Sequence, residues 1–189
     1  MDARELLDFL KLAEKLKCST RHCYTSSGRH ESVAEHSWRL ALMAYLVSDQ
    51  YPQLDMNKVI KMCLVHDLGE VLTGDIPVFL KTESNEQDEA EGLRGVVDKL
   101  PEPQRSELAN LYAEMDAQKS EEALLYKALD KIESVIQHNE SDIATWLPLE
   151  YDLQLTYGVD ECAHTPYMKA LREAVADDTR RKIEESRKA

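Results

Sequence analysis

Apolar residues recur at three- and four-residue steps along most of this chain, and this spacing restricts its possible folds more than any other feature. Leu125, Leu129 and Ile132 are the clearest example. Strict two-residue alternation of apolar and polar residues does not persist anywhere, and no repeat of fixed period occurs. The sequence therefore predicts an all-α protein built as an irregular helical bundle.

Side chains that can cap a helix mark where several of these helices should begin. Ser32 is followed three residues later by Glu35, a capping box that predicts a helix to about Ser48. Ser84 opens a second such pattern, and Ser120 is a further predicted N-cap. Periodicity also predicts helices over residues 3–17, from near Asp55 to about Gly69, from about Pro103 to Ala117, and after Thr165-Pro166. Residues 18–31 lose the periodicity and collect Ser, Thr and Gly, so they are predicted to form a loop.

The length and composition predict one domain. At 189 residues the chain can bury one sizeable core, and 43% hydrophobic with 31% charged residues suits a globular helical protein. We expect a single domain over residues 1–189, in which residues 165–189 form a last helix and a charged tail. The charge run that begins at Asp177 indicates a solvated helix end.

The net charge restricts the possible partners. The chain has 23 Lys and Arg against 36 Asp and Glu, a formal charge of -13 at pH 7. This charge repels the phosphate chain of a nucleic-acid polymer, and no Lys/Arg-rich block offers a local exception. A small anionic substrate can still bind where a metal dication and one or two arginines reverse the potential inside a cleft.

The cysteines and the N-terminus favour a cytoplasmic location. Cys18, Cys23, Cys63 and Cys162 form no CxxC pair and lack the density of a secreted disulfide scaffold. The N-terminus has acidic residues where a signal peptide would be basic, and no apolar run approaches the roughly 18 residues of a membrane span. We therefore expect neither export nor membrane insertion.

Two histidines are expected to point into the core. Each helical residue advances by about 100°, which places His36 in the apolar stripe of its helix and His66 in that of the next. Glu70 lies four residues beyond His66 and therefore above it, and Asp67 follows His66 directly. Inward polar groups need partners, because unpaired ones are costly. A divalent metal is one such partner, and an ordinary hydrogen-bonded core histidine is the alternative.

Asp130 belongs to a polar stripe on a later helix. It shares that stripe with Glu133 and Gln137, beside the apolar Leu129 and Ile132. Taken alone, such a stripe indicates an ordinary solvated face.

Three sequence motifs together resemble a known family. Glu35-His36, His66-Asp67 thirty residues later, and the string KALDKIE over residues 127–133 look like the H…HD…D signature of the HD-domain phosphohydrolases. The string HDLGEVLTGDIP, residues 66–77, is similar in particular to the bacterial 5′-deoxynucleotidase branch. The resemblance covers about residues 20–157 and implies an HD-domain-like helical bundle.

The resemblance also implies a set of site residues. It assigns His36, His66, Asp67 and Asp130 as ligands of one metal, and Glu70 and Asp75 as catalytic or substrate-positioning acids. In the related enzyme an adjacent Arg and Trp contact the nucleotide; Arg21 agrees with this pair, whereas His22 departs from it. Arg29 and Lys81 are further candidates to hold a phosphate.

The remaining histidines receive no metal assignment. His22, His30 and His164 form no convincing ligand pattern, so a single-metal phosphomonoesterase site is favoured over a two-metal site. His138, in the run His138-Asn139-Glu140, is expected to cap or form a local hydrogen bond, and Trp146 is expected in the core. Imidazole and carboxylate ligands suit Mn, Fe, Co, Ni or Zn better than Ca.

The leading functional hypothesis is a nucleoside 5′-monophosphate phosphatase that prefers deoxyribonucleotides. A divalent metal activates water and polarises a phosphoryl oxygen, which is the chemistry that phosphate hydrolysis requires. One alternative is an HD hydrolase of another phosphorylated metabolite. The other is a non-catalytic helical binding module stabilised by its metal, which would not need the extra acids Glu70 and Asp75. The related enzymes are dimers, so a homodimer is a further expectation.

Overall fold

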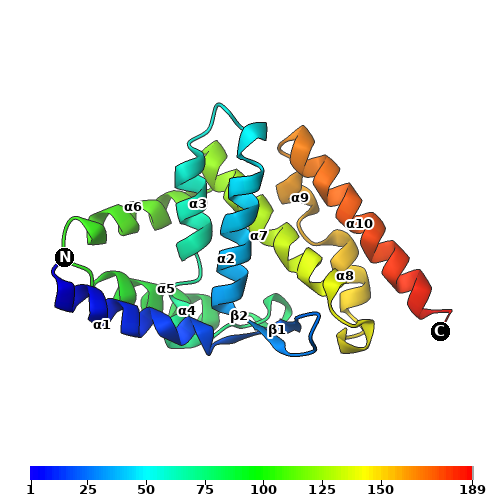
Figure 1. The fold of residues 1–189 in the computed structure, drawn as a ribbon, viewed down its shortest axis with the longest axis horizontal. Coiled ribbons are helices and arrows are strands. Elements are labelled where there is room, and N and C mark those ends of the chain that lie inside the picture. The colour runs from blue at the N-terminus through cyan, green and yellow to red at the C-terminus, as the bar shows by residue number, and fades with distance from the viewer. Residues whose placement is uncertain (189) are drawn as a thin grey trace.

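The computed structural model describes residues 1–188, which form an irregular bundle of helices (Figure 1). In chain order the elements are α1 (Ala3–Ala13), the 3₁₀ helix η1 (Glu14–Lys17), β1 (Thr20–Tyr24), β2 (His30–Ser32), α2 (Val33–Leu46), η2 (Ser48–Gln50), α3 (Met56–Val65), α4 (Glu70–Thr73), η3 (Val78–Leu80), α5 (Glu83–Val97), α6 (Gln104–Ala117), α7 (Glu121–Glu140), η4 (Ile143–Thr145), α8 (Glu150–Thr156), α9 (Val159–Cys162) and α10 (Pro166–Ser186). The predicted all-α class is confirmed.

Most helix starts follow the predicted caps. The Ser32 hydroxyl accepts a hydrogen bond from the Glu35 amide at 3.3 Å, and the Glu35 carboxylate accepts one from the Ser32 amide at 2.9 Å. The Ser120 hydroxyl caps α7 in the same way. The prediction at Ser84 is wrong by two residues: Thr82 and Asn85 form the reciprocal pair, so α5 begins at Glu83.

The predicted loop over residues 18–31 is wrong, because β1 and β2 pair there as an antiparallel hairpin. The strands are too short and irregular to produce an alternation that sequence patterns can detect. Contacts from elsewhere hold the hairpin in place: the Gln137 side-chain amide donates to the Tyr24 carbonyl at 2.7 Å, and the Val33 amide donates to the Ser19 carbonyl at 2.9 Å. The hairpin thus lies against α7 at the start of α2.

The main core surrounds α7, which packs on α2, α3, α9 and α10. Its fully buried side chains include Leu40, Val59, Met62, Leu129 and Ile132. A smaller cluster of Leu16, Val33, Leu68, Val71 and Val96 lies between η1, α2, α4 and α5. Burial of these apolar faces packs α2, α3 and α7 against one another. The polar residues on the same faces are thereby held in fixed positions.

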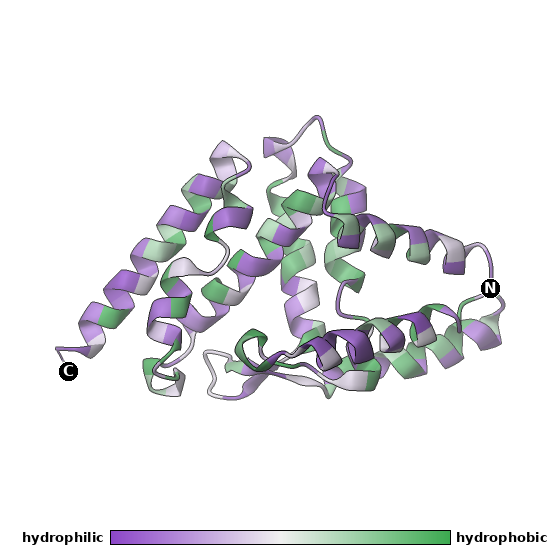
Figure 2. Cartoon of the chain, turned by 180° about the vertical axis from the view of Figure 1, so that it is seen from behind, coloured by the Kyte–Doolittle hydropathy of each residue, from purple (hydrophilic) through white to green (hydrophobic). Residues whose placement is uncertain are grey.

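The charged C-terminal segment is a helix rather than a tail. α10 continues to Ser186, and Thr179 and Ile183 are buried against the bundle. Figure 2 shows α10 as one of the most hydrophilic helices, which agrees with a solvated outer face. Among residues 1–188, no helix combines the length and the apolar character that crossing a membrane requires.

Candidate active site

The four residues assigned as metal ligands converge from three helices. His36 comes from the first turn of α2, His66 and Asp67 from the end of α3, and Asp130 from the middle of α7. The two imidazole Nε2 atoms lie 3.2 Å apart. His66 Nε2 is 2.9 Å from an Asp67 oxygen and 3.6 Å from an Asp130 oxygen, and His36 Nε2 is 3.3 Å from the same Asp130 oxygen.

The second nitrogen of each ring fixes the tautomer. His66 Nδ1 lies 2.9 Å from the Cys63 carbonyl, which only accepts, so this nitrogen carries the hydrogen. His36 Nδ1 contacts the Glu133 carboxylate and donates to it in the same way. In the neutral rings both Nε2 lone pairs therefore face each other and the two aspartates, an arrangement that requires a cation between them.

The spacing of these nitrogens fits a transition metal. Two ligands about 2.05 Å from one tetrahedral ion lie about 3.3 Å apart, close to the observed separation. In the ion-free protein a proton takes the place of the metal. Burial and the Arg21 charge act to lower the pKa of His36, but the Glu133 and Asp130 carboxylates outweigh them and raise it to about 10.

Glu133 anchors the first ligand from behind. It is fully buried, and besides His36 it accepts a 2.6 Å hydrogen bond from Arg39 Nε. Arg21 Nη1 lies 3.5 Å from Glu133 Oε2, the oxygen that also contacts His36. The expectation that Glu133 and Gln137 lie on a solvated face is therefore wrong: α2 and the hairpin cover that side of α7, and ion pairs compensate the buried charge.

Glu70 and Asp75 line the same pocket as three of the four ligands, His36, Asp67 and Asp130. Glu70 opens α4, and the positive φ of Gly74 turns the chain so that Asp75 returns to the pocket. Burial, with the nearby charges of Asp67 and Asp75, raises the pKa of Glu70 to about 9. Glu70 Oε2 has no hydrogen-bond partner among the described residues. In the ion-free protein Glu70 is thus a proton carrier beside the ligand set.

Arg21 supplies the positive charge at the floor of the pocket. Its Nη1 donates to Glu31 Oε2 at 2.9 Å, and its Nη2 donates to the Ser134 hydroxyl at 2.9 Å. These bonds leave further N–H groups for an anion. The guanidinium is held in a fixed orientation next to the ligands, as phosphate binding requires.

The other predicted substrate contacts divide into two groups. His22 and Lys81 line the pocket; His22 Nε2 lies 3.3 Å from Glu150 Oε1, and Lys81 pairs with Glu89 at 2.6 Å. Arg29 does not lie with them. It is exposed at the hairpin turn, where its guanidinium forms a bidentate pair with Glu35 at 2.5 and 2.9 Å. Since the Glu35 capping carboxylate holds it there, we remove Arg29 from the set of phosphate contacts.

Comparison with known proteins decides the family. The HD domain family matches residues 13–172 of this chain. This chain belongs to the HD-domain family. The HD-domain chain is 36% identical over 142 residues to human 5′-deoxynucleotidase HDDC2, covering 73% of this chain and 69% of the human protein. It is 35% identical over 144 residues to the Dictyostelium discoideum protein of the same name, covering 71% and 76%.

Solved structures share the fold of this HD-domain chain. A protein from Magnetospirillum magnetotacticum MS-1, named as a predicted metal-dependent phosphohydrolase, matches with a TM-score of 0.79 and 26% identity, covering 95% of this chain and 93% of that one. The cyanophage S-2L HD phosphohydrolase DatZ, bound to dA and one catalytic Zn²⁺ ion, matches with a TM-score of 0.56 and 22% identity, each chain being covered to 98%. The HD-domain fold that the motifs predict is confirmed.

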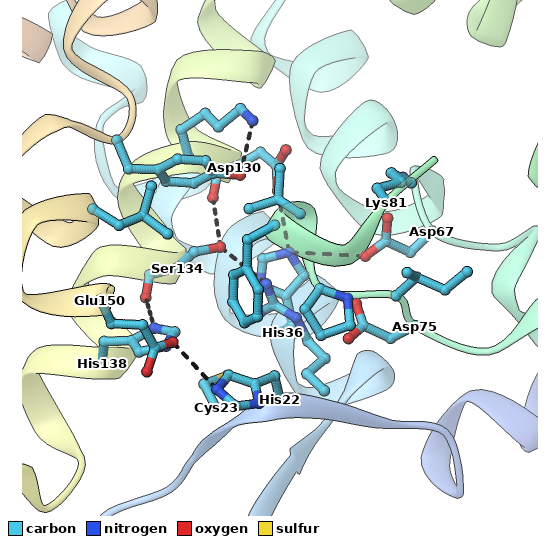
Figure 3. A pocket seen from close by; sticks show the side chains of 18 of the residues that line it. His22, Cys23, His36, Asp67, Asp75, Lys81, Asp130, Ser134, His138 and Glu150 are labelled. Carbon is cyan, nitrogen blue, oxygen red and sulfur yellow. Dashed lines mark hydrogen bonds and ion pairs between the residues drawn. The ribbon is translucent and has the colours of Figure 1, made fainter. Parts of the chain in front are cut away.

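The HD-domain pocket also contains residues that sequence analysis missed (Figure 3). Lys127, Lys131, Ser134, His138, Glu150, Gln154 and Tyr157 all line it. Lys127 Nζ pairs with Asp130 at 2.9 Å, and Lys131 Nζ donates to the Tyr157 hydroxyl at 2.8 Å. Lys127, Ser134 and His138 carry a usable signal, because they lie three, four and eight residues from Asp130 and share its side of α7. Lys131 directly follows Asp130 and carries no such signal. Those on α8 and after it carry none.

His138 makes the expected local hydrogen bond and a second contact. Its Nδ1 donates to the Ser134 carbonyl at 2.9 Å, and its Nε2 lies 3.0 Å from Glu150 Oε1. Both ring nitrogens of His138 are thus engaged, one by α7 itself and the other by the Glu150 carboxylate on α8. Trp146 is buried as expected and donates to the His138 carbonyl at 3.1 Å.

Proposed function

We propose that this HD-domain protein is a metal-dependent 5′-deoxynucleotidase, which hydrolyses deoxynucleoside 5′-monophosphates to nucleoside and phosphate. The observation that carries the proposal is the pair of facing Nε2 atoms of His36 and His66, 3.2 Å apart and enclosed by carboxylates, beside the acids of the same pocket. The similarity to proteins named 5′-deoxynucleotidase over more than two thirds of the chain supports the substrate class.

The ligand set proposed for the single metal is His36, His66, Asp67 and Asp130. Two imidazoles and two carboxylates favour Mn, Fe, Co, Ni or Zn. When bound, such a dication activates water and stabilises charge on the phosphoryl oxygens. Glu133 contributes by holding His36 in the tautomer that presents Nε2 to the centre.

Arg21 orients the phosphate in this proposal. Its guanidinium is fixed by Glu31 and Ser134 and lines the pocket, so it can present the remaining N–H groups to two phosphate oxygens. Lys127 and Lys131 add positive charge on the α7 side. These residues offset the acidic surroundings and align the phosphorus for attack.

Glu70 and Asp75 move the protons. Attack by a water oxygen forms a new bond to phosphorus, while the bond from phosphorus to the 5′ oxygen breaks and that oxygen gains a proton. Glu70 keeps a proton in its buried position and can donate it to the leaving oxygen. Asp75, whose pKa is also raised by burial, orients and deprotonates the attacking water in this scheme.

A substrate screen tests the proposed function against its alternatives. Phosphate release is measured for deoxynucleoside and ribonucleoside 5′-monophosphates and for non-nucleotide phosphomonoesters, with Mn, Co, Ni, Fe, Zn and Mg added separately. The proposal expects the highest kcat/KM for a deoxynucleotide. A higher value for a non-nucleotide ester favours an HD hydrolase of another metabolite. No release with any metal favours the non-catalytic module.

We also propose that the protein forms a homodimer through α2. Trp38, Leu42, Tyr45 and Leu46 recur at helical spacing and are exposed, Trp38 by 63% and Tyr45 by 64%. A continuous exposed apolar face supports self-association, and a two-fold axis lets the same face meet itself. Sedimentation analysis should give a dimer for the parent and a monomer for the Trp38→Glu/Leu46→Glu variant. A monomeric parent rejects this interface.

A cytoplasmic location is part of the proposal. Cys18, Cys23, Cys63 and Cys162 are all free thiols, which a reducing compartment maintains. Fractionation of cells that express the tagged chain is the test, and recovery with secreted proteins would contradict the assignment.

A further inference from the structure

Helix α8 forms a wall of the pocket, and none of the proposed metal-binding or catalytic residues lies on this helix. Glu150, Leu153 and Gln154, at positions i, i+3 and i+4, share the face of α8 that lines the pocket. Figure 3 shows Glu150 and His138 on the side of the pocket away from Asp67. His138 lies eight residues beyond Asp130 on α7, about 12 Å along the axis at 1.5 Å per residue. A substrate whose phosphate lies at the ligand set would direct its other end toward this wall.

Gln154 has no partner in this wall. The residue is 3% exposed, and its buried side-chain oxygen Oε1 accepts no hydrogen bond from any described residue. Only its main-chain carbonyl is used, accepting from Arg172 Nη2 at 3.0 Å. A buried carboxamide oxygen without a hydrogen-bond donor destabilises a fold, so its position next to a pocket points to a ligand that satisfies it.

The other polar groups of the wall are already satisfied. Both Glu150 oxygens are occupied, Oε1 by His138 and His22 and Oε2 by the Leu147 amide at 2.6 Å. Leu153 presents an apolar surface next to Gln154, and Pro77 and Phe79 line the same pocket. The wall therefore offers an apolar surface beside one carboxamide oxygen that has no partner, which matches a flat heterocycle that has a polar edge.

A nucleobase edge places a hydrogen-bond donor next to an acceptor, and a carboxamide pairs with such an edge through two hydrogen bonds. We propose that Gln154 is a base-contacting residue, whose carboxamide binds the edge of the nucleobase while the phosphate lies at the ligand set. This inference rests on the proposed nucleotidase function and adds to it the residue that contacts the base. Because the carboxamide can rotate so that its NH₂ group and its oxygen exchange places, it can pair with the edges of several bases.

The experiment compares Gln154→Leu with the parent on two substrates. One is dAMP; the other is 1,2-dideoxyribose 5-phosphate, which keeps the sugar ring and phosphate and lacks the base. We expect kcat/KM for dAMP to fall about tenfold, as loss of a hydrogen-bonded contact does, with no change on the baseless substrate. The thermal midpoint should stay equal or rise, since the variant removes an unpaired buried amide. Thr156→Val, on the exposed side of α8, is the matched control and should change neither substrate.

In the substrate comparison, two kinds of result overturn the inference, and they can be told apart. If the parent cleaves both substrates equally well, no base contact exists and the proposed nucleotidase function fails as well. If the parent prefers dAMP and Gln154→Leu keeps the whole preference, or loses the same factor on both substrates, only the role of Gln154 is rejected. Should the variant not fold, the parent supplies the measurement: the Gln154 side-chain NH₂ resonance should shift when deoxyadenosine is added and stay in place with inorganic phosphate. An unmoved resonance with deoxyadenosine rejects the contact.

Discussion

His36 and His66 face each other with their Nε2 atoms 3.2 Å apart, although they lie thirty residues apart in the chain on successive helices. The Nδ1–H of each ring donates a hydrogen bond to a fixed acceptor, that of His66 to the Cys63 carbonyl of its own helix and that of His36 to Glu133 on α7. The fold thus turns Nε2 of both rings toward the centre before any ion binds. Several measurable properties depend on this arrangement.

Asp130→Asn should weaken metal binding and leave the helix content nearly unchanged. The substitution keeps the shape but removes a charge that faces both His36 and His66. A metal titration followed by calorimetry, together with a circular dichroism spectrum, is the measurement. Glu121→Gln, exposed in the first turn of the same helix, is the control. Affinity equal to that of the parent would exclude Asp130 as a ligand.

Glu133→Gln should reduce both stability and metal affinity. The glutamate is fully buried and pairs with Arg39 Nε and with the buried His36 ring, which is protonated in the ion-free protein. Breaking such a buried charge pair costs about 3–5 kcal/mol. His36 also loses the carboxylate that fixes its tautomer. Urea unfolding of the metal-free protein measures the first effect and metal titration the second. A variant as stable as the parent, with the same affinity, contradicts this role.

The apolar stripes and the inward positions of His36 and His66 could be predicted from the sequence, because both depend on local spacing. His36 and His66 lie where the helical count places them, and the caps at Ser32 and Ser120 are formed. The sequence prediction failed at Glu133, because the pattern of a polar side chain beside an apolar stripe is the same whether that side chain faces solvent or another helix. The α8 wall was also missed, because its residues reach the pocket through the packing of α8 on α10 and the contact of Glu150 with His138, neither of which follows from local spacing.

Glu70→Gln should lower kcat by about 10²–10⁴ while metal content stays near that of the parent. The amide is similar in size to the protonated acid but cannot transfer a proton. Turnover at saturating substrate and metal analysis of the same sample are the measurements. Glu86→Gln, exposed on α5, is the matched control. An unchanged kcat would remove Glu70 from the mechanism.

Metal binding should release a proton at neutral pH. The pKa of His36 in the ion-free protein is raised to about 10, so below that pH the ring is protonated and the ion must displace its proton. Affinity should therefore rise as the pH increases toward about 10, by about tenfold per unit for one proton, and weaken as the pH falls. Calorimetric titration in buffers of different ionisation enthalpy counts the protons. No release at pH 7 would show that His36 is already neutral there.

We propose that the deoxynucleotidase activity depends on one metal held by His36, His66, Asp67 and Asp130. The most direct test is phosphate release from a deoxynucleoside 5′-monophosphate by protein first stripped with EDTA and then titrated with Mn, Co, Ni, Fe or Zn. We predict no release above blank from the stripped protein and full recovery near one equivalent of at least one of these metals. Undiminished release after complete metal removal, or none after reconstitution with any of them, would contradict it.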